Sequence, residues 1–437
     1  MKKYLALLLV LVMVLSLAAC ASKPAETTDE PEQTTPVPAP AEETKDEEPA
    51  PAEETKEEEP TEEPADNTEY AVAMITDYGD ITDQSFNQTT YEACKAFCED
   101  NGVQFSYFKP AGDNTADRVA MIEKAVDEGY NVIVMPGYAF GGAIVEAAPE
   151  FPDVKFIALD VAKGDLLEAG VAKAGESYDY NPDNWDLEKY VDMSNVYCAI
   201  YQEELCGYMA GYAAVKLGYK NLGFLGGMAV PAVIRYGYGY VQGVDAAAKE
   251  LGITVDMKYA YGNQFYGDAD ITAVMDTWYA DGTEVVFACG GGIYTSAVDA
   301  AKKVGAKVIG VDVDQAGVIA NYAGVDGMTV TSAMKGLYPA TYDTLTDVIV
   351  NGNWEKYVGK IETLGLVSGT DPEANYVQIP MGDGTQWSDS FTQDDYKAMV
   401  KDMFDGKITV SNNTSSDVSA ADFATVITVD DQGSIKG

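Results

Sequence analysis

The chain has 437 residues, with 28 Lys and Arg, 71 Asp and Glu and no His, so its formal net charge is −43. Without histidine there is no Ser-His-Asp or Cys-His nucleophile pair, no HExxH zinc helix and no imidazole acid-base group. The acidity also disfavours nucleic acid as a partner, because phosphate binding needs clustered Lys and Arg.

The N-terminus has the order of an export signal. Two lysines precede an apolar run over 5–17, which is too short to span a bilayer as a mature helix. Residues 17–20 read Leu-Ala-Ala-Cys, the pattern of a bacterial lipobox whose cysteine receives diacylglycerol. A plain secretory signal with an incidental cysteine is the alternative. We therefore predict a signal peptide over 1–19 and lipidation of Cys20, which would hold the protein on the extracytoplasmic face of the cell membrane.

Residues 20–69 are predicted to be an acidic, disordered linker. Eighteen acidic side chains and three lysines lie between 21 and 69, and such a segment cannot bury enough apolar surface to offset its ordering entropy. The unit PAEETKDEEPA at 40–50 recurs as PAEETKEEEPT at 51–61, a low-complexity repeat that proline and charge repulsion extend. We interpret this segment as a tether for a globular part over 70–437.

The globular part alternates strand patterns with helix patterns. Strands of a first series are predicted over 70–76, 103–108, 131–135 and 154–159, with helices over 85–100, 114–128 and 141–150. Strands of a second series are predicted over 195–201, 221–225, 254–259, 284–288 and 307–311, with helices over 203–217, 233–251, 270–279 and 294–304. Continuous apolar runs are typical of buried parallel strands. Two such series predict an α/β protein with two parallel sheets.

These series suggest two lobes. We place the first at about 70–194 with a return segment after 315, and the second at about 195–314 with part of the C-terminal region. The segment 164–194 has no assigned role.

Function is expected in the loops that follow the strands, because ligands of open α/β sheets gather outside the carboxyl ends of the strands. Unusual residues in these loops are Asp77, Gly137, Asp160, the glycines at 226–227 and 290–292, and Asp312. Neither a Walker loop nor a clean GxGxxG follows a strand. Nucleotide hydrolysis and dinucleotide redox chemistry thus lose their usual sequence support, and no cofactor is expected.

Five motifs occur in order along the globular part. They read ITDYGDITDQSFNQ at 75–88, MAGYAA at 209–214, VVFACGGG at 285–292, VIGVDVDQ at 308–315 and TSAMK at 331–335. Together they resemble the basic membrane protein family, the lipoprotein substrate-binding components of ABC importers that include purine nucleoside receptors. The resemblance implies a type I periplasmic-binding-protein fold, in which two Rossmann-like lobes joined by a multi-strand hinge close on one ligand. It also implies a purine nucleoside ligand, ABC permease subunits as partners, a monomer, and no enzymatic activity.

The resemblance further implies which residues contact the base. Phe86 would stack on one face and Phe265 on the other, because a purine offers a π-face to each ring. Tyr266 is the alternative to Phe265. Asp77 matches the acid that contacts the base edge.

On the ribose side, the resemblance implies Gly291, Asp312 and Lys335, whose amide, carboxylate and ammonium groups can satisfy a buried diol. Asn87, in SFNQ, and Asp160, at the end of a strand, complete the expected site. No metal site is expected, because Asp77 and the acids after it lack the EF-hand order.

Each residue also has an ordinary structural interpretation. Phe86 could be a core residue at a helix start, Asp312 a helix cap, Lys335 a surface lysine, and the glycines at 290–292 a tight turn. The cysteines after Cys20 are interpreted as small buried residues, and one disulfide is compatible with the sequence. They are Cys94, Cys98, Cys198, Cys206 and Cys289.

Other functions remain open at this point. The same fold could bind riboflavin or a sugar, or it could serve as a nucleoside sensor or adhesin without transport. A nucleoside hydrolase or phosphorylase could use carboxylates near a ribose. Against such an enzyme stand the predicted lipid anchor, the absence of histidine and the lack of a dense carboxylate cluster.

Overall fold

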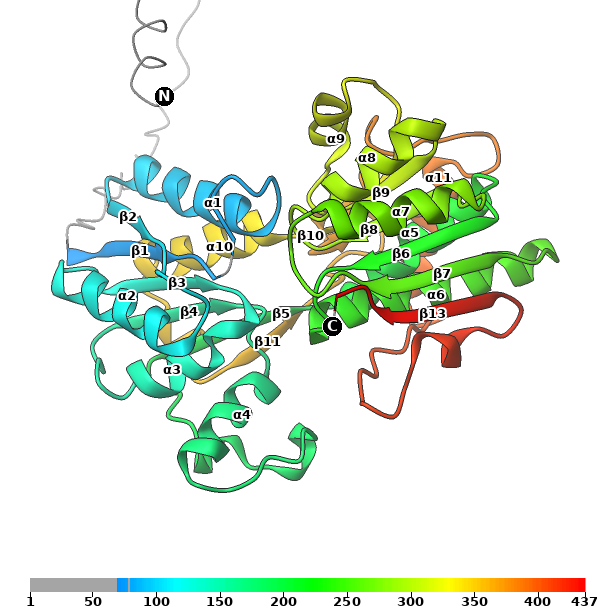
Figure 1. The fold of residues 1–437 in the computed structure, drawn as a ribbon. Coiled ribbons are helices and arrows are strands. Elements are labelled where there is room, and N and C mark those ends of the chain that lie inside the picture. The colour runs from blue at the N-terminus through cyan, green and yellow to red at the C-terminus, as the bar shows by residue number, and fades with distance from the viewer. Residues whose placement is uncertain (1–68, 78, 437) are drawn as a thin grey trace, which may run out of the picture. The chain divides into compact units, whose positions relative to one another are not determined.

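The computed structural model describes residues 69–77 and 79–436 (Figure 1). The predicted signal peptide, Cys20 and nearly all of the predicted linker lie outside the described residues. The described chain forms two α/β lobes, each built on one sheet. None of its helices combines the length and the apolar composition that a membrane span requires.

The first sheet has six parallel strands in the order β11-β5-β4-β3-β1-β2. Its strands are β1 (Ala71–Ile75), β2 (Gln104–Phe108), β3 (Val132–Pro136), β4 (Lys155–Leu159), β5 (Val196–Tyr201) and β11 (Ile361–Leu364). Its helices are α1 (Phe86–Asn101), α2 (Thr115–Asp127), α3 (Gly141–Ala147), α4 (Lys163–Lys173) and α10 (Leu337–Leu345). Every residue of β3 is buried, as expected for a strand covered on both faces.

The second sheet has the order β12-β10-β9-β8-β6-β7-β13, and only β12 runs antiparallel to its neighbour. Its strands are β6 (Asn221–Gly226), β7 (Asp256–Tyr261), β8 (Val285–Cys289), β9 (Lys307–Asp312), β10 (Thr329–Lys335), β12 (Val377–Gln378) and β13 (Thr428–Ser434). Its helices are α5 (Glu203–Lys216), α6 (Pro231–Leu251), α7 (Ala269–Ala280), α8 (Tyr294–Val304), α9 (Ala316–Ala323) and α11 (Gln393–Phe404).

The placement of β5 corrects the predicted lobe boundary at residue 195. The strand was expected to open the second lobe, but it pairs with β4 and β11 in the first sheet. An apolar run predicts a buried strand but does not identify its sheet, because both sheets bury such strands equally. The chain enters the second lobe only after β5, at α5.

Three connections between the lobes occur within residues 79–436: β5 to α5, β10 to α10, and β11 to β12 (Figure 1). Helix α10 packs on the first lobe, where Tyr342 donates a hydrogen bond to Asp100 at 2.8 Å and meets the ring of Phe97 edge-on. The lobes are therefore joined by several strand ends rather than by one linker.

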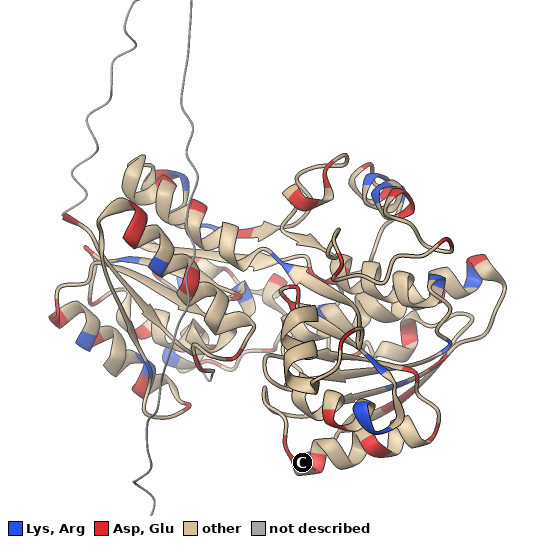
Figure 2. Ribbon diagram, turned by 90° about the horizontal axis from the view of Figure 1, so that it is seen from above, with Lys and Arg blue, Asp and Glu red and all other residues tan. Residues whose placement is uncertain are grey.

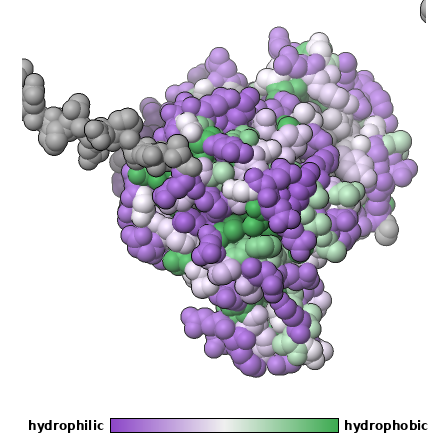
Figure 3. Space-filling model, turned by 90° about the vertical axis from the view of Figure 1, so that its left-hand side faces the viewer, coloured by the Kyte–Doolittle hydropathy of each residue, from purple (hydrophilic) through white to green (hydrophobic). Residues whose placement is uncertain are grey.

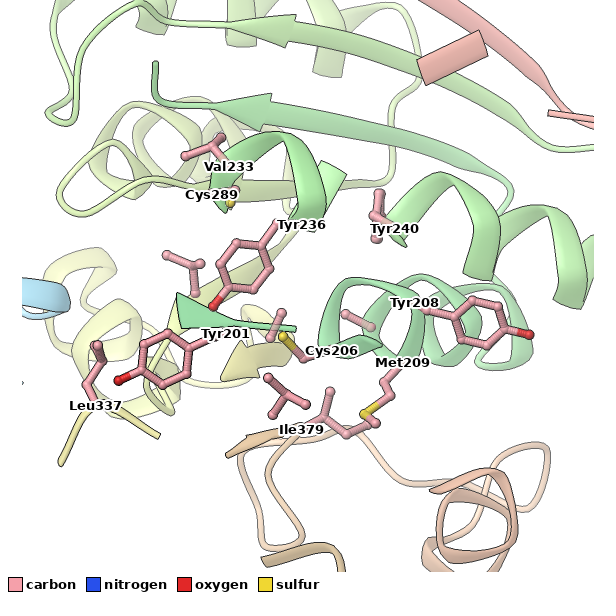
Figure 4. Packing of buried hydrophobic residues seen from close by; sticks show 14 of the residues in the cluster. Tyr201, Cys206, Tyr208, Met209, Val233, Tyr236, Tyr240, Cys289, Leu337 and Ile379 are labelled. Carbon is pink, nitrogen blue, oxygen red and sulfur yellow. The ribbon is translucent and has the colours of Figure 1, made fainter. Parts of the chain in front are cut away.

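Helices α5 and α6 lie in backbone contact at the centre of the second lobe. A Cβ on Gly207 of α5 would overlap the carbonyl oxygen of Tyr236, and one on Gly239 of α6 would overlap that of Glu204. Figure 4 shows Tyr236 and Tyr201 in the cluster of buried side chains beside these helices. The glycines thus permit a close approach of α5 and α6, which brings the start of α5 next to α6.

The five cysteines after Cys20 are all buried and free. Their interpretation as buried residues is confirmed, and none of them forms a disulfide. Burial raises the pKa of the Cys198 and Cys206 thiols, which keeps them protonated and unreactive.

Segment 164–194 begins within α4 and continues as two short 3-10 turns. Its aromatic side chains contact one another, with ring centroids 5.7 Å apart for Tyr178 and Trp185 and 5.4 Å for Trp185 and Tyr190. Charged side chains of both signs are spread over both lobes (Figure 2). The side of the first lobe shown in Figure 3 is mainly hydrophilic, with separate hydrophobic patches.

Candidate ligand-binding site

A pocket of about 600 Å³ lies at the carboxyl ends of strands from both sheets. The first lobe contributes residues that follow β1, β2, β3 and β4, and the second contributes loops that follow β6, β7 and β8 together with the ends of β9 and β10. All eight residues expected from the sequence line it: Asp77, Phe86, Asn87, Asp160, Phe265, Gly291, Asp312 and Lys335. Side chains separated by more than 250 positions are thus brought into one cavity.

Two aspartates at strand ends have left-handed backbone conformations. Asp160, directly after β4, has φ 60°, and Asp312, at the end of β9, has φ 65°. Their strands hold equivalent places in the two sheets, since β4 is third from the edge strand β11 and β9 is third from the edge strand β12. Aspartate tolerates this region better than most residues, yet such conformations cost about 1 to 3 kcal/mol and cluster at functional sites.

Lys335 lies between these two aspartates. Its Nζ is 2.5 Å from Asp160 Oδ2, 3.7 Å from Asp312 Oδ1 and 3.6 Å from Glu203 Oε1. Only 5% of Lys335 is exposed, so the interpretation as a surface lysine is wrong. Burial by itself lowers the pKa of Lys335, but the charges of Asp160, Asp312 and Glu203 outweigh burial and raise it. The ammonium therefore stays charged.

Aromatic rings surround the same ammonium. The Nζ of Lys335 is 4.7 Å from the ring centroid of Phe86, 5.5 Å from that of Tyr201 and 5.7 Å from that of Tyr236. A cation over a ring face is attracted by the ring quadrupole. Tyr236 also donates a hydrogen bond to Asp312 at 3.3 Å. One end of the pocket thus combines a fixed positive charge with ring faces.

Glu203 lies behind this end of the pocket, where it faces Lys335 without lining the cavity, and it is absent from the expected set. It is 0% exposed, and Arg235 of α6 donates to its Oε2 at 2.7 Å. Burial raises the pKa of Glu203, opposed by the charge of Arg235. Glu203 comes two residues after β5, and this place near the carboxyl end of a strand could have identified it from the sequence. It was missed because that strand was expected to open the second lobe.

The loop before α1 is organised by Asp83, also absent from the expected set. Its carboxylate accepts hydrogen bonds from the backbone N–H groups of Ser85, Asn87 and Gln88 at 2.9 to 3.1 Å. Burial raises the pKa of Asp83 to about 6. An acid just before a helix start is a known capping signal, so this role was accessible from sequence.

Asn87 connects that cap to Asp77. Its Nδ2 donates to Asp77 Oδ1 at 3.0 Å and to Asp83 Oδ2 at 3.1 Å. Asp77 also accepts from Gly79 N at 2.9 Å. The geometry therefore gives Asn87 a positioning role beside the pocket. Within residues 69–77 and 79–436, no three or more Cys, Asp or Glu side chains are grouped to hold a metal.

Besides the contact of Lys335 with Asp160, hydrogen bonds from the loop before α1 and from Gln315 join the lobes at the pocket. Ser85 donates to Asp312 Oδ2 at 2.6 Å, and Gln315 donates to the backbone oxygen of Gln84 at 3.1 Å. Since Ser85 directly precedes Phe86, the first-lobe aromatic is held against the second lobe.

The second-lobe aromatic, Phe265, packs against the backbone of Gly227 and Gly290. A Cβ on Gly227 would lie 2.5 Å from Phe265 Cδ1, and one on Gly290 would lie 3.2 Å from it. The backbone oxygen of Phe265 accepts a hydrogen bond from Gly292 N at 2.9 Å. Tyr266 also lines the pocket but is 62% exposed. The more enclosed of the two rings is Phe265.

The pocket is chemically suited to a molecule with flat rings and hydroxyl groups. Carboxylates outnumber its two lysines, Lys109 and Lys335, so a negatively charged ligand would meet repulsion. Burial raises the pKa of Cys289, the cysteine that lines the pocket, well above its usual value. That thiol therefore remains protonated and is a poor nucleophile.

Comparison with known proteins agrees with this geometry. A family model described as ABC transporter substrate-binding protein, PnrA-like, matches residues 70–370. The ABC transporter nucleoside-binding protein BmpA of Lactococcus lactis subsp. cremoris is 27% identical over 360 residues, which cover 78% of this chain and 89% of that protein. An uncharacterized lipoprotein of Pyrococcus abyssi is 25% identical, with 70% of this chain and 69% of that protein covered.

Among solved structures, a solute-binding protein of an ABC transporter system from Aeropyrum pernix aligns with TM-score 0.56 and 20% identity, covering 79% of this chain and 88% of that one. The described chain has the type I periplasmic-binding-protein fold, with parallel sheets in two lobes. Since the family model covers more than half of the sequence, the chain belongs to the Bmp family of PnrA-like ABC transporter substrate-binding proteins.

Proposed function

We propose that the protein is an extracytoplasmic lipoprotein that binds purine nucleosides between its lobes and delivers them to an ABC permease. The observation that carries this proposal is the single pocket that combines one phenylalanine from each lobe, Phe86 and Phe265, with carboxylates and a buried lysine. The name of the Lactococcus lactis relative, a nucleoside-binding protein, supports it.

At the base end, Phe86 and Phe265 offer ring faces to a flat heterocycle. Stacking of a base on an aromatic side chain is worth about 1 to 3 kcal/mol and tolerates different bases. Asp77 then distinguishes among bases, because an ionised carboxylate only accepts hydrogen bonds. Its two contacts from Gly79 and Asn87 hold Oδ1 in place.

At the sugar end, ribose hydroxyls would donate to carboxylates and accept from Lys335. Asp160 Oδ1 is buried and has no hydrogen-bond partner within the described residues. A buried acceptor without a donor is costly, so a ligand hydroxyl reaching this atom would gain a full hydrogen bond. Asp312 offers a second carboxylate 3.7 Å from the same ammonium.

The charge of the site favours nucleosides over nucleotides. Lys335 is already shared by three carboxylates, and Lys109 is paired with Asp80 at 2.6 Å. A phosphate group would bring added negative charge into this partly dehydrated region. We therefore propose a neutral nucleoside as the ligand.

Attachment and delivery follow from the rest of the chain and its family. The lipobox at 17–20 supports a lipid anchor on Cys20, and some relatives are named lipoproteins. Family membership supports permease subunits as partners. The protein would act as a monomer and release its ligand unchanged.

Isothermal titration calorimetry of the chain from residue 21 onward tests the proposal. Adenosine, inosine, guanosine, xanthosine, riboflavin, ribose and inosine 5′-monophosphate would be titrated separately. We expect at least one purine nucleoside to bind with a Kd in the micromolar range or tighter, about 8 kcal/mol or more. The monophosphate should bind at least about tenfold more weakly, and incubation should release no free base.

Binding of ribose or riboflavin with no response to nucleosides would replace the ligand by one of these alternatives. Release of free base, followed by chromatography, would instead assign an enzymatic activity. To test the anchor, cells would be labelled with palmitate, and equal label in the wild type and in Cys20→Ser would contradict lipidation at Cys20.

A further inference from the structure

The C-terminal strand β13 forms an edge of the second sheet, outside the family match. It runs parallel to β7, with Thr428 opposite Asp256 and Ser434 opposite Tyr261. Beyond the strand, Ile435 N donates to Tyr261 O at 2.8 Å. Because the two strands are parallel, the last residues of β13 lie beside the loop that leaves β7 toward the pocket. We call residues 262–268 the aromatic loop, since they carry Phe265 and Tyr266.

The strand is anchored along its length. Trp278 of α7 donates to the side chain of Gln432 at 3.0 Å. Before the strand, Asp245 of α6 accepts from the backbone N–H groups of Thr425 and Val426 at 2.7 and 2.8 Å. The end of β13 is therefore held in place independently of the aromatic loop.

Lys436 extends from this fixed end into the aromatic loop. Its Nζ donates to Gln264 Oε1 at 3.0 Å and also contacts Asp268 Oδ2. A second acidic group, Asp270, lies 4.0 Å from the same Nζ. Lys436 and Asp268 are only about a quarter to a third exposed, at 30% and 25%.

The two partners of Lys436 form the base of the loop. Gln264 Nε2 donates to the backbone oxygen of Tyr266 at 2.8 Å and to Asp268 Oδ2 at 3.0 Å. Asp268 Oδ1 accepts from Asp270 N and Ile271 N at 3.0 Å, which caps α7. One ammonium thus joins Gln264, which directly precedes Phe265, to Asp268 at the end of the aromatic loop.

We infer that Lys436 is a positioning residue, which fixes the aromatic loop so that the ring of Phe265 stays packed against Gly227 and Gly290 beside the pocket. This inference rests on the proposed function in that Phe265 is taken to stack on the ligand. The connection lies outside the family match, which ends at residue 370. Without the ammonium, Gln264 and Asp268 lose their shared donor while β13 and the cap of α7 remain.

The test compares Lys436→Met, Lys436→Arg and the wild type in the chain from residue 21 onward. Affinity for the best-binding nucleoside is measured by calorimetry, and amide hydrogen exchange is measured over the aromatic loop without ligand. We expect Lys436→Met to weaken binding about three- to tenfold, the size of one ordinary hydrogen bond, and to speed exchange in the loop. Lys436→Arg should restore most of the affinity and most of the slow exchange in the loop. The thermal midpoints of both variants should stay within about 2 °C of the wild type.

Lys407→Met is the matched control, since Lys407 pairs with Asp402 and Asp405 at the end of α11 and does not line the pocket. It should leave affinity and loop exchange unchanged. Unchanged affinity in Lys436→Met, whether or not loop exchange increases, would overturn the inference. If the wild type binds no nucleoside, the proposed function fails, and loop exchange alone then decides whether Lys436 orders the loop.

Discussion

Lys335 keeps its charge in a place from which water is nearly excluded. Three carboxylates and three aromatic rings approach its ammonium. A buried ion pair contributes little net stability when it is complete, but removing one partner leaves the others uncompensated. The stability of the protein is therefore sensitive to any substitution that removes Lys335 and leaves the three carboxylates in place.

Lys335→Met should lower the free energy of unfolding by about 3 to 5 kcal/mol, because Asp160, Glu203 and Asp312 would remain buried without their cation. Urea denaturation at pH 7 measures this change. In the folded variant, affinity for ribosides should fall more than affinity for free bases, since the partner proposed for Lys335 is the sugar.

Lys356→Met provides the comparison for an exposed pair. Lys356 lies 3.4 Å from Asp347 and is 58% exposed, and such pairs contribute about 0 to 1 kcal/mol. Equal effects of the two substitutions would contradict the account of Lys335 as a buried centre.

Phe86 and Asp77 should respond differently to substitution, because stacking tolerates any base whereas a carboxylate selects among hydrogen-bond patterns. Phe86→Ala should weaken adenosine, inosine and guanosine by a similar factor, about 1 to 3 kcal/mol. Asp77→Asn converts an acceptor-only group into one that also donates, so the order of preference should change. Calorimetry with all three nucleosides measures both effects. An unchanged order in Asp77→Asn, with full affinity in folded Phe86→Ala, would refute this division of roles.

How far the site could be predicted from the sequence depends on where each residue stands. Asp77, Asp160 and Asp312 follow strands, and the rule that ligands gather at strand ends identifies such positions. Arg235 lies within α6, and its contact with Glu203 exists only because α5 and α6 approach closely. No local pattern contains that contact.

At the scale of elements, the close packing of α5 on α6 determines the geometry behind the pocket. Glycines on both helices meet backbone of the opposite helix. The same two helices carry Glu203, Arg235 and Tyr236. Separating the helices would therefore displace the groups around Lys335.

Gly239→Ala tests this packing. The added Cβ would overlap the carbonyl oxygen of Glu204, which is backbone and cannot rotate away. We expect a loss of at least about 1 to 3 kcal/mol in the free energy of unfolding, measured by urea denaturation, together with weaker ligand binding.

Gly317→Ala is the control, because Gly317 lies in helix α9 with no atom within 4 Å of the added Cβ. Alanine is the better helix former by about 1 kcal/mol, so this variant should be as stable as the wild type or more so. A stable Gly239→Ala protein with unchanged binding would contradict the importance of the contact.

The elements themselves were predicted well where apolar runs alternate with amphipathic helices. The helix expected over 85–100 is α1 (Phe86–Asn101), and the strand over 131–135 is β3 (Val132–Pro136). The sheet that a strand joins could not be predicted in the same way, because strand pairing depends on partners distant in sequence. The strand β5, which pairs in the first sheet, is the example. The edge strand β13 was not predicted, since its exposed sequence TVDDQGS lacks an apolar run.

At the scale of the whole molecule, acidic side chains lie in the interior as well as on the surface. Burial raises the pKa of Asp83 to about 6 and those of Asp165 and Glu204 to about 7. At a pH between the unfolded and the folded pKa values, each of these carboxyl groups is protonated in the folded protein but ionised in the unfolded chain. The free energy of unfolding therefore decreases as pH rises through the window between the unfolded and folded pKa values.

Glu204→Gln isolates one such group. Glu204 is 2% exposed, and its pKa rises from 4.5 to about 7, so ionising it on the folded protein costs about 3 kcal/mol. Glu204 alone should account for this much of the wild type's loss of stability between about pH 4.5 and pH 8, and the variant should lack that part of the decrease. Urea denaturation at several pH values compares the two slopes. Parallel slopes would contradict the assignment.

If the protein binds a nucleoside as proposed, both lobes contact that one molecule at the pocket between them. The most direct measurement is a crystal structure of the chain from residue 21 onward with the nucleoside that binds most tightly in calorimetry. We expect the base to lie between the rings of Phe86 and Phe265, and the ribose hydroxyls to lie within hydrogen-bond distance of Asp312 and Lys335. A nucleoside bound elsewhere, or in this pocket without contact to either ring, would contradict it.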